Sequence, residues 1–261
     1  MTGQAPPAKE AKHVQLRKRA LVDAGKPGEP KWRVRSFFRF LASAILLPLF
    51  RVRVSGVENI PQQRPVLLSP NHLSNMDGLI VFALTKRYNL PLRILAKREL
   101  WNIRPLGWLL DSAGILPISR DKADLDTLRT ASAALSAGDS MAIFPEGTRI
   151  RNEDMLADEG GALGEASGGA AWLAIRNDVP VIPLGISGTE YIRPDGMKLM
   201  RFPAVNLHFG PALNPAEAVP ASDYKRKERV LKLTELIMAG LAEAVDQART
   251  ENSERRPKLR Q

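Results

Sequence analysis

The sequence contains no cysteine and only three histidines, His13, His72 and His208, in 261 residues. The absence of cysteine excludes disulfides, thiolate nucleophiles and cysteine-based zinc sites. Three histidines scattered along the chain make any other zinc site unexpected. We therefore expect no bound metal and no other cofactor, and a general base has few candidates.

A long apolar run is also missing. The first apolar segment, residues 37–50, is shorter than the ~20 residues that a simple membrane-spanning helix needs, and it contains Arg39 and Pro48. Several cations precede it: Lys26, Lys31, Arg33 and Arg35. Each would add roughly 1 kcal/mol of attraction to an anionic leaflet. We expect residues 31–50 to lie on a membrane surface as an amphipathic helix. A buried first helix of a soluble fold is the alternative.

The N-terminus is polar and basic, and no cleavable signal peptide is apparent. The net charge of +10 indicates an acidic partner, which could be nucleic acid, an anionic membrane surface or a phosphorylated substrate. A nucleic-acid-binding protein would need a basic stripe with interleaved aromatics or a known module, and neither is present. We therefore expect an anionic membrane surface as partner and no nucleic acid, although a basic binding protein without catalysis remains the alternative from another class.

We expect residues 1–30 to form a disordered basic extension, after which the chain alternates short apolar runs with amphipathic stretches. Strands are expected at 52–57, 65–69, 93–96, 115–118, 141–144, 179–186 and 205–209. Helices are expected at 78–87, 105–113, 124–138, 170–176 and 224–248. This pattern predicts an α/β fold with a mainly parallel sheet flanked by helices, behind the N-terminal interfacial helix. The main domain is expected over residues 51–250, followed by a charged tail at 251–261.

The most informative segment is residues 69–78, which reads Ser-Pro-Asn-His-Leu-Ser-Asn-Met-Asp-Gly. It places Asp77 five residues after His72 in a polar turn that follows a buried strand. Histidine is the side chain whose ordinary pKa lies nearest neutrality, and a nearby carboxylate can orient its ring. The pair therefore suits abstraction of a proton from a hydroxyl. A hydrogen-bonded turn without chemistry is the plainer interpretation.

Two further polar motifs follow expected strands: Ser119-Arg120, and the run Pro145-Glu146-Gly147-Thr148-Arg149. In a parallel sheet, ligands bind beyond the carboxyl ends of the strands. Since all three motifs occupy that position, we expect them to form one site.

Four segments in this order resemble the conserved blocks of the glycerolipid acyltransferases, above all the 1-acylglycerol-3-phosphate O-acyltransferases. They are Asn71-His72-x4-Asp77; Lys97-x-Glu99-Leu100 with residues 114–120; Phe144-Pro145-Glu146-Gly147-Thr148-Arg149; and Val179-Pro180-Val181-Ile182-Pro183. The resemblance covers about residues 50–215. The spacing of His72 and Asp77 alone is weak, but its combination with the Phe-Pro-Glu-Gly-Thr-Arg block is specific.

The resemblance implies transfer of a fatty acyl group from an acyl thioester to the hydroxyl of a lysophospholipid, turning 1-acylglycerol 3-phosphate into phosphatidate. His72 would be the general base, oriented by Asp77, and no enzyme nucleophile is needed. The donor would be acyl-CoA or acyl carrier protein. Arg149 is the first candidate to hold the acceptor phosphate, followed by Arg120 and Lys97, with Glu146, Gly147 and Thr148 completing the binding segment. The location implied is the cytoplasmic face of a membrane.

The sequence departs from the family pattern in two places. Ile150 follows the third block where members usually have Ser, and residues 166–169 read Ala-Ser-Gly-Gly where a Phe-Lys-x-Gly element is usual. The missing Lys removes one cation that could face the acceptor. Glycerol 3-phosphate, an amino-lipid or a glycolipid therefore remain open as acceptors, and so does a non-catalytic scaffold of the same fold.

Overall fold

The structure, a computed structural model, describes residues 30–62, 65–88, 90, 92–118, 125–146, 163, 166–193 and 199–255. Its centre is a seven-stranded sheet with the order β1-β7-β6-β2-β5-β3-β4. The strands are β1 (Arg53–Ser55), β2 (Leu67–Pro70), β3 (Leu92–Lys97), β4 (Leu116–Ile118), β5 (Ser140–Ala142), β6 (Val181–Ser187) and β7 (Asn206–Phe209). Every pair is parallel except β6 with β7. The predicted α/β fold with a mainly parallel sheet is confirmed.

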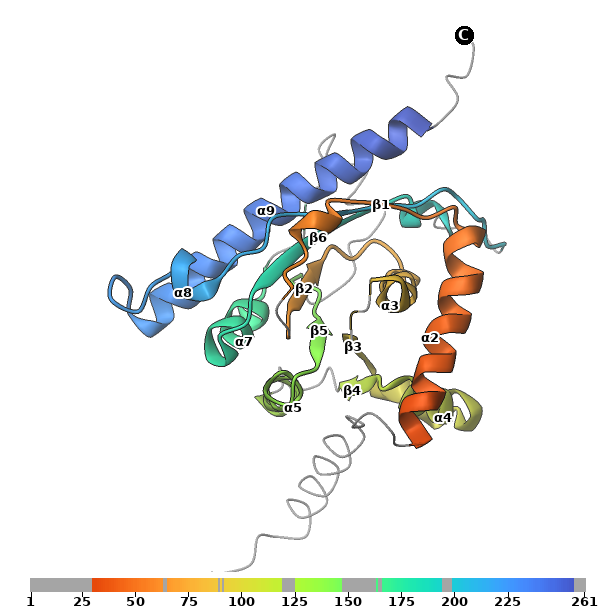
Figure 1. The fold of residues 1–261 in the computed structure, drawn as a ribbon, viewed down its shortest axis with the longest axis horizontal. Coiled ribbons are helices and arrows are strands. Elements are labelled where there is room, and N and C mark those ends of the chain that lie inside the picture. Colours follow the sequence, from red (N-terminus) through yellow and green to blue (C-terminus); the bar gives the residue numbers. More distant parts are fainter. Residues whose placement is uncertain are drawn as a thin grey trace, which may run out of the picture.

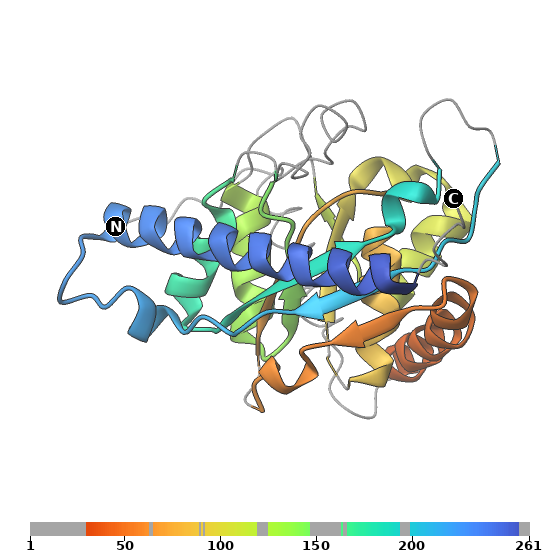
Figure 2. The same cartoon turned by 90° about the horizontal axis from the view of Figure 1, so that it is seen from above.

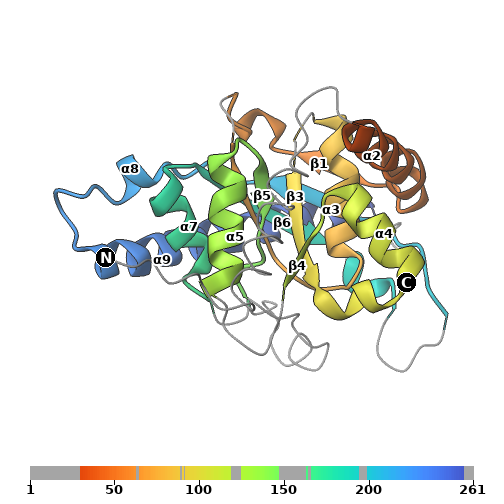
Figure 3. The same ribbon diagram turned by 90° about the horizontal axis from the view of Figure 1, so that it is seen from below.

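Helices cover both faces of the sheet (Figure 1). One face carries α2 (Pro30–Leu49), α3 (Asp77–Arg87) and α4 (Arg104–Ala113). The other carries α5 (Leu125–Ser136), α7 (Gly169–Asn177) and the long α9 (Arg226–Arg255), with the short α8 (Pro215–Ala218) beside α7. Figure 2 shows α9 crossing in front of β6 and β7, and Figure 3 shows α5 and α4 from the opposite side. The sheet is thus enclosed between two helical layers.

Strand β2 lies in the middle of this sheet, and all four of its residues are buried. Successive side chains of a strand point to opposite faces. Accordingly, Leu68 belongs to the core beneath α3 with Ile80, whereas Leu67 belongs to the core beneath α7 with Leu173. Burial on both faces explains why residues 66–68, which lead into and begin this strand, are all apolar. The polar turn that follows β2 therefore begins at the centre of the carboxyl edge.

Helix α2 is held on the fold by Arg39. Its Nε donates to Thr85 Oγ1 at 2.8 Å, and its Nη2 donates to the backbone carbonyls of Thr85 and Leu90. Burial lowers the pKa of Arg39. The charge that interrupts the apolar run thus faces α3, whereas Phe37 and Phe40 are each more than half exposed. In the described part of the chain, no helix is long and apolar enough to cross a membrane.

Candidate functional site

His72 and Asp77 are in contact at the carboxyl end of β2. His72 Nδ1 lies 3.0 Å from Asp77 Oδ2, and that oxygen also accepts the backbone N–H groups of Leu73 at 2.7 Å and Ser74 at 2.6 Å. Asp77 is fully buried at the first position of α3, where the helix dipole favours a negative charge. The carboxylate therefore closes the turn and fixes the imidazole with Nδ1 toward Asp77, which leaves Nε2 as the nitrogen for a substrate.

Asn71 ties this turn to the neighbouring strand β6. Its side chain is fully buried, accepts the N–H of Ile186 at 2.7 Å and donates to the carbonyl of Ile186 at 3.0 Å. An amide that makes both bonds to one backbone position behaves like an additional strand residue. Asn71 therefore fixes the position of the His72 turn relative to the end of β6.

Phe144 and Glu146, which follow β5, also contact His72. The ring of Phe144 stacks on the imidazole, with ring centroids 4.2 Å apart and an angle of 28° between the planes. Glu146 is buried, and its Oε2 accepts the backbone N–H of His72 at 3.4 Å. Glu146 thus joins the end of β5 to the turn that holds His72. Phe144 and Glu146 of the third sequence block therefore lie next to the first block, because β5 pairs with β2 in parallel.

The remaining candidates are described only in part. Lys97 is the last residue of β3, paired with Ile118, so its backbone lies on the same edge of the sheet as His72. Arg120 and the segment Gly147, Thr148 and Arg149 lie outside the described residues. The structure therefore brings together His72, Asp77 and Glu146, and places the backbone of Lys97 two strands away from β2.

The turn also narrows the choice of groups for stabilising an oxyanion. Backbone N–H groups are common donors for that purpose. Those of His72, Leu73 and Ser74 already donate to the carboxylates of Glu146 and Asp77. An oxyanion would therefore need donors other than these three.

Glu190 is a carboxyl group beside the pair that the sequence did not indicate. It lies in a turn directly after β6, and its Oε2 accepts the N–H of Gly188 at 2.7 Å. Burial raises the pKa of Glu190, with a further upward contribution from the charge of Asp77, while hydrogen bonds from its own and the Gly188 backbone and the charge of Arg249 act in the opposite direction. A second acidic group thus lies within electrostatic reach of the His72–Asp77 pair.

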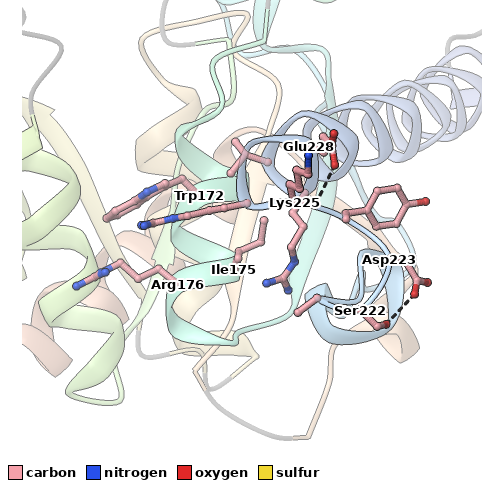
Figure 4. Close-up of a pocket in the computed structure, with 12 residues that line it drawn as sticks. Trp172, Ile175, Arg176, Ser222, Asp223, Lys225 and Glu228 are labelled. Carbon is pink, nitrogen blue, oxygen red and sulfur yellow. Dashed lines mark hydrogen bonds between the residues drawn. The ribbon is translucent and has the colours of Figure 1, made fainter.

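A cavity of about 850 Å³ lies elsewhere, between α7 and the start of α9 (Figure 4). Its lining contains four cations, Arg176, Lys225, Arg226 and Arg229, and the guanidinium of Arg176 lies 5.4 Å from the centre of the Trp172 ring. None of its lining residues belongs to the 71–77 turn or to residues 144–146. The cavity gathers part of the positive charge, but it is separate from the His72–Asp77 pair.

The known proteins to which this chain is similar are acyltransferases. A family model described as Acyltransferase matches residues 51–187. A chloroplastic 1-acyl-sn-glycerol-3-phosphate acyltransferase from Brassica napus is 29% identical over 169 residues, which are 62% of this chain and 46% of that protein. A 1-acyl-sn-glycerol-3-phosphate acyltransferase from Pseudomonas aeruginosa is 31% identical over 168 residues, 63% of this chain and 60% of that protein. This chain thus spans about half the length of these relatives.

A solved structure has a similar fold along almost the whole chain. The crystal structure of the 1-acyl-sn-glycerophosphate acyltransferase PlsC from Thermotoga maritima superimposes with a TM-score of 0.65 at 20% sequence identity. The match covers 96% of this chain and 99% of that one. At this identity the likeness concerns the fold.

Proposed function

The chain belongs to the acyltransferase family, and we propose on this basis that it transfers a fatty acyl group from an acyl thioester to the free hydroxyl of 1-acylglycerol 3-phosphate, giving phosphatidate. The observation that carries the proposal is the His72–Asp77 contact of 3.0 Å inside the matched region. The names of the relatives from Brassica napus and Pseudomonas aeruginosa, both 1-acyl-sn-glycerol-3-phosphate acyltransferases, support the choice of acceptor.

In the proposed reaction His72 Nε2 takes the proton of the acceptor hydroxyl while its oxygen attacks the thioester carbonyl. The tetrahedral intermediate then collapses, the carbon–sulfur bond breaks, and the imidazolium returns the proton to the leaving thiolate. Asp77 keeps the Nδ1 proton in place and stabilises the imidazolium. General base catalysis of this kind contributes about 10²–10⁴-fold to the rate. The stacked Phe144 restricts rotation of the ring.

For the acceptor phosphate we propose Arg149 first, with Arg120 and Lys97 as further cations. A guanidinium can hold a phosphate through two parallel hydrogen bonds, which an ammonium group cannot do. The position of Glu146 against the His72 backbone supports a place for Gly147, Thr148 and Arg149 next to the reacting hydroxyl, since these residues follow directly in the chain. The donor is acyl-CoA or an acyl carrier protein.

We also propose that the enzyme works on the cytoplasmic surface of an anionic membrane, with α2 in contact with the lipid. The outer face of α2 carries a regular stripe of exposed apolar side chains: Phe37, Phe40, Leu41, Ile45 and Leu49. Trp108 of α4, which is 63% exposed and packs edge-on against Phe38, extends this surface. A contiguous apolar surface of this kind is typical of an interaction site and not of a solvated face.

The test is an acceptor panel assayed with one acyl-CoA: lysophosphatidate, glycerol 3-phosphate, an amino-lipid and a glycolipid. We expect phosphatidate formation from lysophosphatidate to exceed the other products by at least about tenfold, since the amino-lipid and the glycolipid lack the phosphate and glycerol 3-phosphate lacks the acyl chain. If another acceptor is clearly turned over and lysophosphatidate is not, the proposed acceptor is wrong, while the proposed acyl transfer stands. No turnover of any acceptor, with intact folding, would contradict the activity.

A further inference from the structure

A second apolar surface adjoins the end of α2, and nothing in the sequence motifs accounts for it. Residues 199–202, Leu-Met-Arg-Phe, precede β7 in the connection from β6. Leu199 is 82% exposed, more than any other large apolar side chain of the described residues, and Met200 is 50% exposed. A single exposed leucine is ordinary, but adjacent exposed apolar side chains are not.

The segment is firmly attached to the chain at the end of α2. The rings of Phe202 and Phe50 lie 5.6 Å apart, and Arg51 Nη2 donates to the carbonyl of Phe202 at 2.8 Å. Arg201 N donates to the carbonyl of Ile192 at 2.7 Å, which fixes the segment against the turn after β6. The apolar stripe of α2 therefore continues past Leu49 into residues 199–202.

The charges around this surface indicate which kind of partner it binds. Arg51, Arg193 and Arg201 are all exposed beside it. Exposed apolar side chains surrounded by cations are the combination with which interfacial segments bind anionic lipid, because burial in the acyl region and attraction to the headgroups act together.

We propose that residues 199–202, together with the end of α2, insert into an anionic lipid surface and turn the carboxyl edge of the sheet toward it. This inference rests on the proposed function only in assigning the reacting lipid. Strand β6 ends at Ser187 and is bonded through Ile186 to Asn71, the residue before His72. Because Ser187 at the end of β6 pairs with Asn206 at the start of β7, a membrane contact in the connection between these strands places His72 at the side from which a lipid hydroxyl arrives.

The test compares two variants of the full chain. The double variant Leu199→Asp, Met200→Asp changes only exposed positions and leaves Phe202, which packs on Phe50, unchanged. The matched control is Leu231→Asp, because Leu231 is also 66% exposed but lies near the start of α9, far from α2 (Figure 1). Thermal unfolding midpoints of the three proteins check that neither substitution alters the fold.

Binding is measured by flotation with vesicles of phosphatidylcholine and phosphatidylglycerol. We expect the double variant to bind about tenfold or more weakly than the wild type, and the Leu231 variant to bind normally, because interfacial binding scales with the apolar area inserted. Unchanged binding of the double variant would overturn the proposal, as would an equal loss in the control. A change in oligomeric state without a change in vesicle binding would overturn it in favour of an interface between copies of the chain.

Turnover separates this inference from the proposed function. Lysophosphatidate embedded in vesicles should be acylated more slowly by the double variant, whereas a short-chain, water-soluble lysophosphatidate should be acylated at the wild-type rate. An equal loss on both substrates would mean that the segment serves the active site and not the membrane, which overturns the proposal. If the wild type acylates neither substrate while the binding difference persists, the proposed function fails and the lipid surface stands.

Discussion

The turn after β2 and the outer surface formed by α2 and residues 199–202 depart from ordinary burial in opposite ways. The turn buries Asn71 and Asp77 completely, whereas the outer surface exposes Phe40 and Leu199. Protein folding normally places such side chains the other way round. The buried polar groups are fixed by hydrogen bonds to the backbone, while the apolar groups are exposed in the part of the chain that the structure describes. The two proposals assign the first region to a reacting hydroxyl and the second to lipid.

The largest effect is expected from Asp77→Asn. The amide oxygen is an uncharged and weaker acceptor for Leu73 N, Ser74 N and His72 Nδ1, and it does not stabilise an imidazolium. Turnover of lysophosphatidate should fall about 10²–10⁴-fold, measured at saturating substrate. Vesicle binding should stay at the wild-type level. A variant that keeps near wild-type turnover would show that the carboxylate only shapes the turn.

The corresponding change on the outer surface is Phe37→Asp with Phe40→Asp. Both side chains are exposed on α2, so the folded protein should lose little stability, while vesicle binding should drop by about ten- to a hundredfold. Flotation and thermal unfolding measure the two quantities on one sample. If binding persists, or if binding and folding are lost together, α2 is not an independent lipid contact.

Asn71→Ala tests how far the turn depends on β6. Removing both hydrogen bonds to Ile186 leaves a buried N–H and a buried carbonyl unpaired, which should lower the free energy of unfolding by about 1–3 kcal/mol in urea denaturation. Ser222→Ala removes an exposed hydroxyl that donates to the neighbouring Asp223, and this control should change the free energy of unfolding by less than about 0.5 kcal/mol. Equal stability of the two variants would mean that the turn holds its shape without Asn71.

The smallest effect concerns pH. Burial raises the pKa of Glu190 above its ordinary 4.5, so the folded protein binds this proton more tightly than the unfolded chain does. The resulting stability is complete below about pH 4.5 and is lost as the pH rises through the raised pKa. Urea denaturation of wild type and Glu190→Gln across this range should show the wild type losing stability relative to the variant. The control Glu243→Gln changes an exposed position, and its stability should follow the wild-type curve across this pH range. Parallel stability curves for all three proteins would contradict the role given to Glu190.

Much of the fold could be predicted because its strands are buried on both faces. Residues 66–68 are apolar without interruption, so the strand and the polar turn after it were visible in the sequence. The contact between His72 and Asp77 was predictable for a similar reason, since five residues of one turn keep the two side chains close. The roles of these side chains stay predictions, as do those of Arg120, Lys97 and Arg149.

Other contacts depend on the order of the strands in the sheet, which could not be predicted from the sequence. Phe144 stacks on His72 only because β5 lies beside β2, and Glu190 approaches Asp77 only because β6 lies on the other side. Arg39 reads as an interruption of an apolar run until α2 is seen to pack on α3, where its guanidinium meets Thr85. These contacts join distant segments, and no local periodicity encodes them.

The most direct measurement is the rate of acyl transfer to lysophosphatidate by His72→Ala, compared with wild type in the same vesicles. The side chain of His72 is only 18% exposed, and among the described residues its polar contact is with Asp77, so the variant should fold and bind vesicles normally. We expect turnover to fall about 10²–10⁴-fold, as for Asp77→Asn. A folded, membrane-bound His72→Ala protein with wild-type turnover would contradict it.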